Sequence, residues 1–144
     1  MASFISGNFK CGGLPNGKEL PTAWFAVSHR HVEGKEERRR RYGRWCRIDG
    51  EKGTVYRVIR FAPNLAGDKE SIVLDWQACI DLAGKSGQEG EEMELAIRPA
   101  SLLGRLLATV KHPDPTHRLM GWVSIISLGL AVCSIAITLW QVCR

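Results

Sequence analysis

Residues 12–18 match the opening of a phosphate-binding loop, G-x-x-x-x-G-K, in which backbone amides and the lysine hold phosphate. The next residue is Glu19, where this mechanism needs a Ser or Thr to hold magnesium. Pro15 removes one backbone donor from the loop, and Pro21 is a poor continuation for the helix that should follow. We therefore predict that this segment binds no nucleotide.

A second candidate is a metal site. His29 and His31 lie two residues apart in a predicted strand and would point to the same face of it. Together with Cys11 and Cys46 they could supply four zinc ligands, but zinc sites usually show paired, closely spaced ligands, and these two cysteines are far apart. The pattern is more typical of surface histidines, so no metal ion and no cofactor is predicted.

Catalytic motifs are missing from the sequence. There is no Gly-x-Ser-x-Gly, no His-Glu-x-x-His and no Cys-x-x-Cys pair. Asp75 and Asp81 are the only carboxylates set in an apolar run, and nothing else in the sequence assigns them to one acid and base pair. The chain is predicted to be non-enzymatic, with no catalytic residue.

A basic tract carries the excess charge of the protein. From His29 to Arg47 there are eight basic and three acidic residues, a net charge of +5 that equals the net charge of the whole chain. The run Arg38–Arg41 repels itself and is expected in a loop or an exposed lead-in to a strand. Four interpretations stay open: a solvated loop, contact with anionic lipid, contact with an acidic protein surface, or contact with nucleic acid. The candidate contact residues are Arg38, Arg39, Arg40, Arg41, Arg44 and Arg47.

Strand patterns dominate the chain before residue 100. The clearest pair, 42–48 and 54–61, flanks Asp-Gly-Glu-Lys-Gly and predicts a β-hairpin, with its arginines reaching past apolar neighbours to water. In residues 91–98 apolar and polar side chains alternate, as in a half-buried strand. Further strands are predicted at 22–32 and 71–76, with residues 75–82 as another strand or one helical turn.

These patterns predict a small, mainly β domain of five or six strands, sandwich or barrel-like, over residues 22–99. An irregular arm or short hairpin, rich in glycine and proline, is expected before it, over residues 1–21.

Residues 100–118 are predicted to connect this domain to a membrane. In residues 100–111 five aliphatic residues fall on one side of a helix. This amphipathic helix could pack on the sheet or lie at a membrane surface, and its nearness to the span favours the surface slightly. Pro113 and Pro115 should then form a stiff elbow, with Asp114 or Thr116 capping the next helix.

Residues 119–143 are predicted to form a transmembrane helix. They include 25 consecutive residues without Asp, Glu, Lys, Arg or His, and at about 1.5 Å per residue they exceed the roughly 30 Å of a hydrocarbon core. Trp122 and Trp140 are about 27 Å apart along such a helix, which would place one indole in each headgroup region.

The same segment contains a stripe of small and polar residues at helical spacing, which we call the seam. Such residues let helices approach closely, so a homo-oligomer or a partner helix would fit. The alternative is that these side chains bond to their own backbone, as is common in membrane helices. The seam residues are Ser124, Ser127, Ala131, Ser134, Thr138 and Gln141.

Flanking charges predict the orientation. Arg105, Lys111 and Arg118 precede the span, whereas only Arg144 follows it, so the N-terminal domain is expected to be cytoplasmic. No apolar run near the N-terminus resembles a signal peptide. A bacterial inner membrane is favoured somewhat over a eukaryotic organelle membrane. The five cysteines, an odd number with no close pair, are expected to be reduced.

The sequence therefore predicts a single-pass, C-terminally anchored membrane protein. Its β domain would be a non-enzymatic binding or adaptor module, or an accessory subunit of a membrane complex. The expected partners are the lipid bilayer, another transmembrane helix or a second copy, and an anionic lipid or acidic protein surface. The alternative is a membrane-tethered nucleic-acid binder that uses the basic tract.

Overall fold

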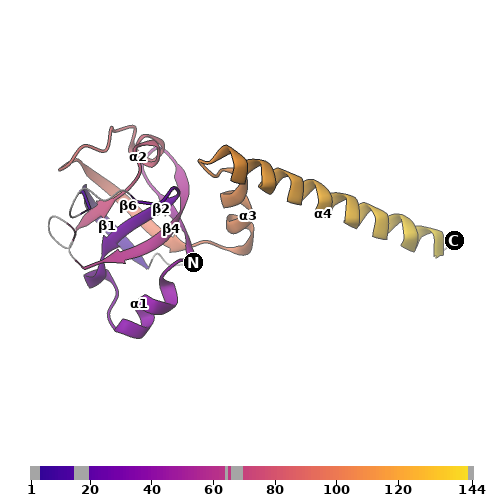
Figure 1. Ribbon diagram of the computed structural model, residues 1–144, viewed down its shortest axis with the longest axis horizontal. Coiled ribbons are helices and arrows are strands. Elements are labelled where there is room, and N and C mark those ends of the chain that lie inside the picture. Colours follow the sequence, from indigo (N-terminus) through magenta and orange to yellow (C-terminus); the bar gives the residue numbers. More distant parts are fainter. Residues whose placement is uncertain (1–3, 15–19, 64, 66–69, 143–144) are drawn as a thin grey trace.

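A computed structural model describes residues 4–14, 20–63, 65 and 70–142. In this part of the chain six strands form a closed barrel, followed by two helices (Figure 1). The order of strands around the barrel is β1-β5-β2-β4-β3-β6, which confirms the predicted mainly β fold class with its short and long C-terminal helices. The strands are β1 (Ile5–Cys11), β2 (Trp24–Ser28), β3 (Trp45–Asp49), β4 (Thr54–Ala62), β5 (Ser71–Val73) and β6 (Glu92–Pro99).

The barrel has two topologically equivalent halves. Replacing β1, β2 and β3 by β4, β5 and β6, and the reverse, reproduces every strand pairing with its direction, including the parallel pairs β1–β5 and β2–β4. A helix precedes the last strand of each half: α1 (Lys35–Arg41) precedes β3, and α2 (Trp76–Ala83) precedes β6. Each of these strand pairings joins a strand of one half to a strand of the other half, so the two halves interlock.

Inward-facing aliphatic and aromatic side chains fill the barrel. In β6 the residues Met93, Leu95 and Ile97 are buried between more exposed neighbours, which confirms the predicted alternation. The predicted hairpin is also present, with Asp49 opposite Thr54 at its tip. Burying one such large side chain contributes about 1.5–3 kcal/mol. The largest buried residues of the barrel strands are Phe9, Phe25, Ile48, Ile59, Ile72, Leu95 and Ile97.

The prediction of an irregular arm over residues 1–21 is wrong for β1. Ile5, Phe9 and Cys11 face the core, while β1 pairs with β6 on one side and with β5 on the other. The glycines and prolines elsewhere in this segment favoured the prediction of irregular structure. β1 forms because it pairs with two other strands, and its local sequence pattern does not show this.

Two predicted strands end earlier than expected. β2 ends at Ser28, and His29–His31 form a 3-10 turn, so the two histidines do not share a strand face. The Ser28 hydroxyl accepts a hydrogen bond from the Arg30 amide at 3.4 Å, which favours a turn over a continued strand. β5 ends at Val73, and α2 begins three residues later.

The arginine run forms a helix, which corrects the expected loop. Arg and Glu are good helix formers, and α1 has acidic residues in its first turn and arginines in its last, the distribution that the helix dipole favours. Glu37 also pairs with Arg40 at 2.8 Å and with Arg41 at 2.5 Å, one turn further on. These pairs offset the repulsion that the arginines would otherwise suffer.

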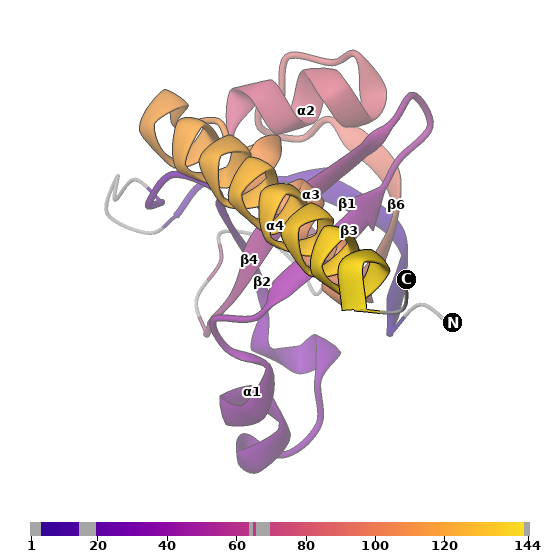
Figure 2. The same ribbon diagram turned by 90° about the vertical axis from the view of Figure 1, so that its right-hand side faces the viewer.

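Two helices follow the barrel: α3 (Leu102–Val110) and α4 (Pro115–Val142). The predicted proline elbow separates them, and Asp114 Oδ1 accepts from the Thr116 amide at 2.8 Å, which caps α4. Figures 1 and 2 show α4 leaving the barrel as one long helix, with α3 lying across its base.

Candidate functional site

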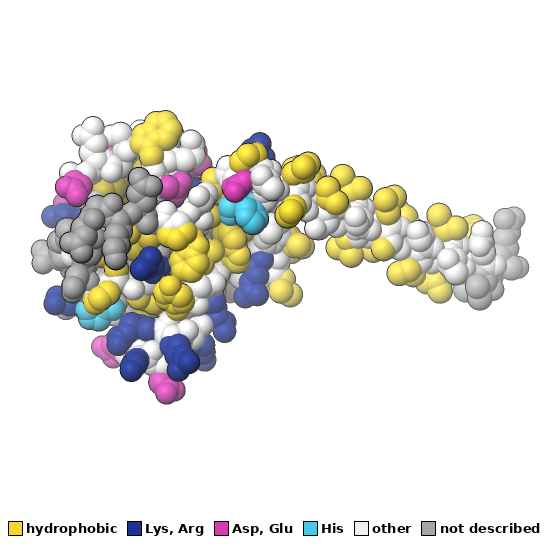
Figure 3. Space-filling model, viewed as in Figure 1, with side chains coloured by type: hydrophobic (Ala, Val, Ile, Leu, Met, Phe, Trp, Pro, Cys, Tyr) yellow, Lys and Arg dark blue, Asp and Glu magenta, His cyan; other side chains and the backbone are white. Residues whose placement is uncertain are grey.

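The first functional element is α4, which is long and apolar enough to cross a membrane. The most apolar 18-residue window within residues 115–141 has a mean hydropathy of 2.2, and none of that window is buried in the protein. Trp122 and Trp140 are both exposed near the two ends of this helix. Figure 3 shows hydrophobic side chains along the described length of α4. A helix of this kind inside a soluble core would be mostly buried.

The seam residues that the structure describes all lie on the exposed surface of α4. Three of the hydroxyls bond to the helix backbone: Ser124 to the Met120 carbonyl, Ser134 to the Leu130 carbonyl and Thr138 to the Ser134 carbonyl, each at 2.9 Å. These hydroxyls are therefore satisfied without a partner. Association through the seam stays a prediction that depends on close packing.

The second element is the basic tract, whose arginines the structure separates into different environments. Arg40 and Arg41 pair with Glu37, and Arg41 also lies over the ring of Phe4, 4.6 Å from its centroid. Hydrogen bonds from Arg41 and then Arg40 lower the pKa of the Glu37 carboxyl, so this carboxyl stays charged opposite them.

The other candidate arginines also differ in their surroundings. Arg47 pairs with Asp49 at 2.7 Å on the surface of the hairpin. Arg44 lies with Arg40 and Arg41 on the side of α1 near Phe4. Of the six candidate arginines, Arg38 and Arg39 turn to the other side of α1.

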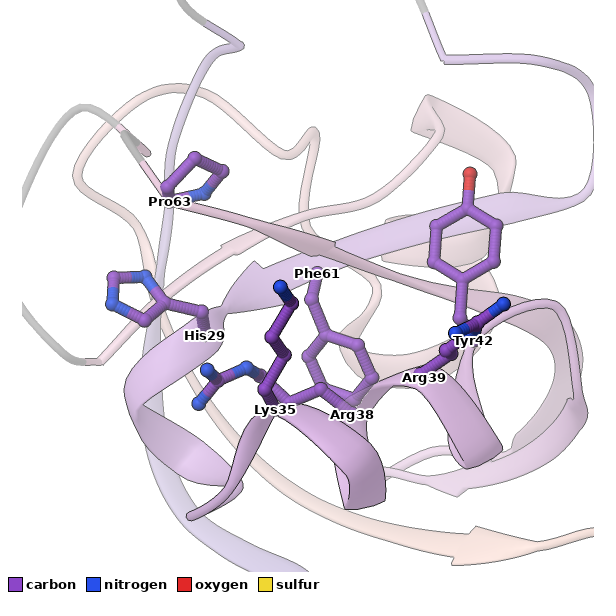
Figure 4. A pocket seen from close by; sticks show the side chains of 7 residues that line it. All are labelled: His29, Lys35, Arg38, Arg39, Tyr42, Phe61 and Pro63. Carbon is purple, nitrogen blue, oxygen red and sulfur yellow. The ribbon is translucent and has the colours of Figure 1, made fainter.

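That other side of α1 borders a pocket of about 440 Å³ (Figure 4). Lys35, Arg38 and Arg39 supply positive charge, and Arg38 is held in place by a hydrogen bond from its Nη1 to the Val32 carbonyl at 3.0 Å. None of the described residues that line the pocket is a carboxylate. The described lining residues are His29, Lys35, Arg38, Arg39, Tyr42, Phe61 and Pro63.

The parallel pairing of β2 with β4 assembles this pocket. Val27 lies opposite Phe61 and Ser28 opposite Ala62, so the chain segments that leave the two strand ends meet at one edge of the barrel. This brings His29 beside Pro63, far apart in sequence. The sequence analysis identified Arg38 and Arg39 as candidate contact residues but missed the other lining residues. A local sequence pattern does not show which strand lies parallel to which, so it could not show that these residues meet.

Helices α1 and α2 occupy equivalent positions in the two halves, yet they pack differently. α2 buries four residues against the barrel, including Cys79 and Leu82, whereas α1 buries none. The packing of α2 accounts for its apolar residues. The arginines of α1 instead make contacts near the surface: Arg38 with the Val32 carbonyl, and Arg40 and Arg41 with Glu37.

The residues considered for zinc lie in separate environments. Among the described residues, no group of three His, Cys, Asp or Glu side chains is arranged to hold a metal ion. Cys11 packs with Cys79, whose thiol hydrogen bond lowers the pKa of Cys11. Burial raises the pKa of Cys46 to about 12. The four described cysteines are free thiols, and residues 15–19 of the loop-like motif lie outside the described residues.

The two carboxylates of the apolar run also separate. Asp75 binds the side chain of Arg57, and Asp81 accepts a hydrogen bond from Gln77 at 3.1 Å. The expectation that Arg57 reaches water is wrong, since its side chain is only 4% exposed. Asp75 therefore neutralises a buried cation.

Comparison with known proteins finds no protein-family model that matches the chain and no curated protein that resembles it in sequence.

Proposed function

We propose that this protein is a membrane-anchored, non-enzymatic binding module. In this proposal α4 crosses the bilayer and the barrel remains on the cytoplasmic side, where the pocket beside α1 receives an acidic group of a protein partner. The observation that carries the proposal is the pocket itself, with three cations, an aromatic wall and no carboxylate among its described lining residues. A carboxylate next to an apolar side chain is complementary to such a surface.

The distribution of charge favours a discrete acidic group over a nucleic acid strand. Strong nucleic-acid binding typically uses about 6–10 phosphate contacts. Here Arg40, Arg41 and Arg47 are paired with carboxylates of the protein itself. Lys35, Arg38 and Arg39, which pair with no carboxylate of the described residues, line one pocket together.

Anchoring and orientation are tested on the full chain. We expect it to stay with membranes after alkaline carbonate extraction, and a tag at residue 1 to be protected from protease added outside intact cells. Release into the supernatant without detergent would end the membrane proposal. Cleavage of the tag in intact cells would show that the N-terminal domain lies outside the cell.

Binding is tested with the full chain in nanodiscs and a fluorescent acidic peptide that contains glutamate and phenylalanine. The double variant Lys35→Glu/Arg39→Glu should weaken binding more than tenfold, since a charge-assisted hydrogen bond contributes about 1.5–3 kcal/mol. Arg40→Glu/Arg44→Glu is the matched control, with the same change of charge outside the pocket, and should have a smaller effect. Equal losses in the two variants would contradict a role for the pocket.

The nucleic-acid alternative is tested in the same assay. A single-stranded oligonucleotide that binds through phosphates should lose affinity steeply with salt, with a slope of about −0.7 for each phosphate contacted. We expect weak binding and a shallow slope. Tight oligonucleotide binding with a steep slope, lost equally in both double variants, would contradict the proposed acidic protein partner and favour nucleic acid as the ligand.

A further inference from the structure

Helix α3 has its small residues inside and its large aliphatic residues outside. Gly104 and Ala108 are buried against the rest of the protein. The four leucines are exposed: Leu102 by 79%, Leu103 by 72%, Leu106 by 45% and Leu107 by 47%. A helix on the surface of a soluble domain normally turns its large apolar residues to the core. The leucine face of α3 is therefore an apolar surface that the described part of the protein does not cover.

The leucine face cannot turn inward without breaking the contact with the barrel. A Cβ on Gly104 would lie 3.1 Å from Cε1 of Tyr56 in β4 and 3.3 Å from Oγ of Ser101. Ser101 caps the helix by accepting a hydrogen bond from the Gly104 amide at 3.1 Å. Only a face with very small residues fits at this distance from the barrel, so the exposure of the leucines is a property of the packing.

Helix α3 is also packed against the base of α4. A Cβ on Gly121 would lie 2.9 Å from the carbonyl carbon of Thr109, so the two helices touch at a glycine. Figure 1 shows α3 running crosswise to α4, between the barrel and the free length of α4. In Figure 3, hydrophobic side chains at this place lie on the side away from the barrel, the direction in which α4 continues.

We infer that α3 lies in the interface of the bilayer that α4 crosses, with its leucines toward the acyl chains. This inference rests on the proposed anchoring by α4. A helix that runs across a membrane-spanning helix is parallel to the membrane surface, the position of an amphipathic interfacial helix. No acidic residue occurs from Ala100 to Lys111, whereas Arg105 and Lys111 are available to lipid phosphates.

The bilayer is the favoured occupant because the leucine face is continuous with the anchor. The elbow that joins α3 to α4 has only four residues, 111–114. The glycine contacts at Tyr56 and Thr109 then fix the barrel to α3 and α3 to α4. The barrel is held in one orientation close to the membrane, and α1 extends from a different side of the barrel than the one α4 leaves (Figures 1 and 2).

The test uses the full chain in liposomes, with Cys133 and Cys143 replaced by alanine and an environment-sensitive fluorophore on one new cysteine. A fluorophore at Leu103→Cys or Leu107→Cys should shift its emission to the blue and be quenched by lipids with a nitroxide near the headgroup. The matched control is Glu94→Cys on the exposed face of β6, where neither effect is expected. Because all three positions are exposed, these changes leave the core intact.

The outcomes separate the two proposals. If the chain resists carbonate extraction but neither leucine position is quenched by lipid, anchoring stands and the interfacial position of α3 is wrong. Shielding from aqueous iodide without quenching by lipid would show that protein covers the leucines, and would also overturn the inference. Release of the chain by carbonate would instead refute the anchor. In addition, Leu103→Glu/Leu107→Glu should abolish the quenching of a fluorophore at Leu102→Cys while the chain stays in the membrane.

Discussion

The carboxylate of Asp75 binds the guanidinium of Arg57 through two hydrogen bonds, Nε to Oδ1 at 2.7 Å and Nη2 to Oδ2 at 2.9 Å. This bidentate pair joins β4 to the beginning of α2, and it explains why Asp75, at the N-cap position, makes no side-chain cap hydrogen bond. The Arg57 side chain lies on the inward side of β4 with Val55 and Ile59, where an unpaired charge would be costly.

Replacing Asp75 should therefore destabilise the barrel more than its partial exposure suggests. Removing one partner of a fully buried ion pair costs about 3–5 kcal/mol, and because the Asp75 side chain is 33% exposed we expect about 2 kcal/mol for Asp75→Asn. The measurement is denaturant unfolding of the full chain in detergent, followed by tryptophan fluorescence. Asp81→Asn is the control and should change stability by no more than about 0.5 kcal/mol. Equal effects would show that the pair does not stabilise the fold.

The glycine contact between α3 and α4 predicts a difference between two substitutions in one helix. Gly121→Ala forces a Cβ against Thr109, whereas Gly129 has no atom within 4 Å of the corresponding position. Hydrogen exchange of the α3 amides should increase about tenfold in Gly121→Ala, since overpacking costs about 1–3 kcal/mol. Gly129→Ala should leave exchange unchanged. Similar exchange in both variants would contradict the close contact.

The elbow predicts a pH dependence centred on His112. Burial, followed by the nearby His117, lowers the pKa of His112 below its usual 6.5. The folded protein therefore binds fewer protons at His112 than the unfolded chain does. The contribution of neutral His112 to the free energy of unfolding is complete above pH 6.5 and is lost as the pH falls through the lower pKa of the folded state. An NMR titration of the His112 ring should give a midpoint below 6.5. A midpoint at or above that value would contradict the packing of His112 against Trp45 and His117, whose rings lie 6.1 and 4.7 Å away.

The seam predicts self-association of α4 or association with another helix. Ser127→Leu/Ser134→Leu would place bulky side chains on the seam and should weaken association of the full chain in membranes by about tenfold, since such contacts contribute about 1–2 kcal/mol. Energy transfer between labelled copies provides the measurement. Ile126→Leu/Val132→Leu, off the seam, is the control. Unchanged energy transfer in the seam variant would end the hypothesis.

The sequence by itself predicted the features that depend on composition and short-range periodicity. Residues 119–143 are apolar whatever their neighbours, the alternation of Met93, Leu95 and Ile97 follows from the two faces of a strand, and Pro113 and Pro115 cannot continue α3. These properties are local, so no knowledge of the fold was needed to recognise them.

The tertiary structure alone decided which residues form the candidate site and which face of α3 packs on the barrel. The pocket exists because β2 and β4 pair in parallel, which places His29 beside Pro63, and the state of each arginine depends on whether a carboxylate such as Glu37 reaches it. Likewise, an amphipathic pattern does not say which face of α3 packs inward; the close approach of Tyr56 to Gly104 does. Contacts between residues distant in sequence are set by strand order and packing, and neither is written in a local pattern.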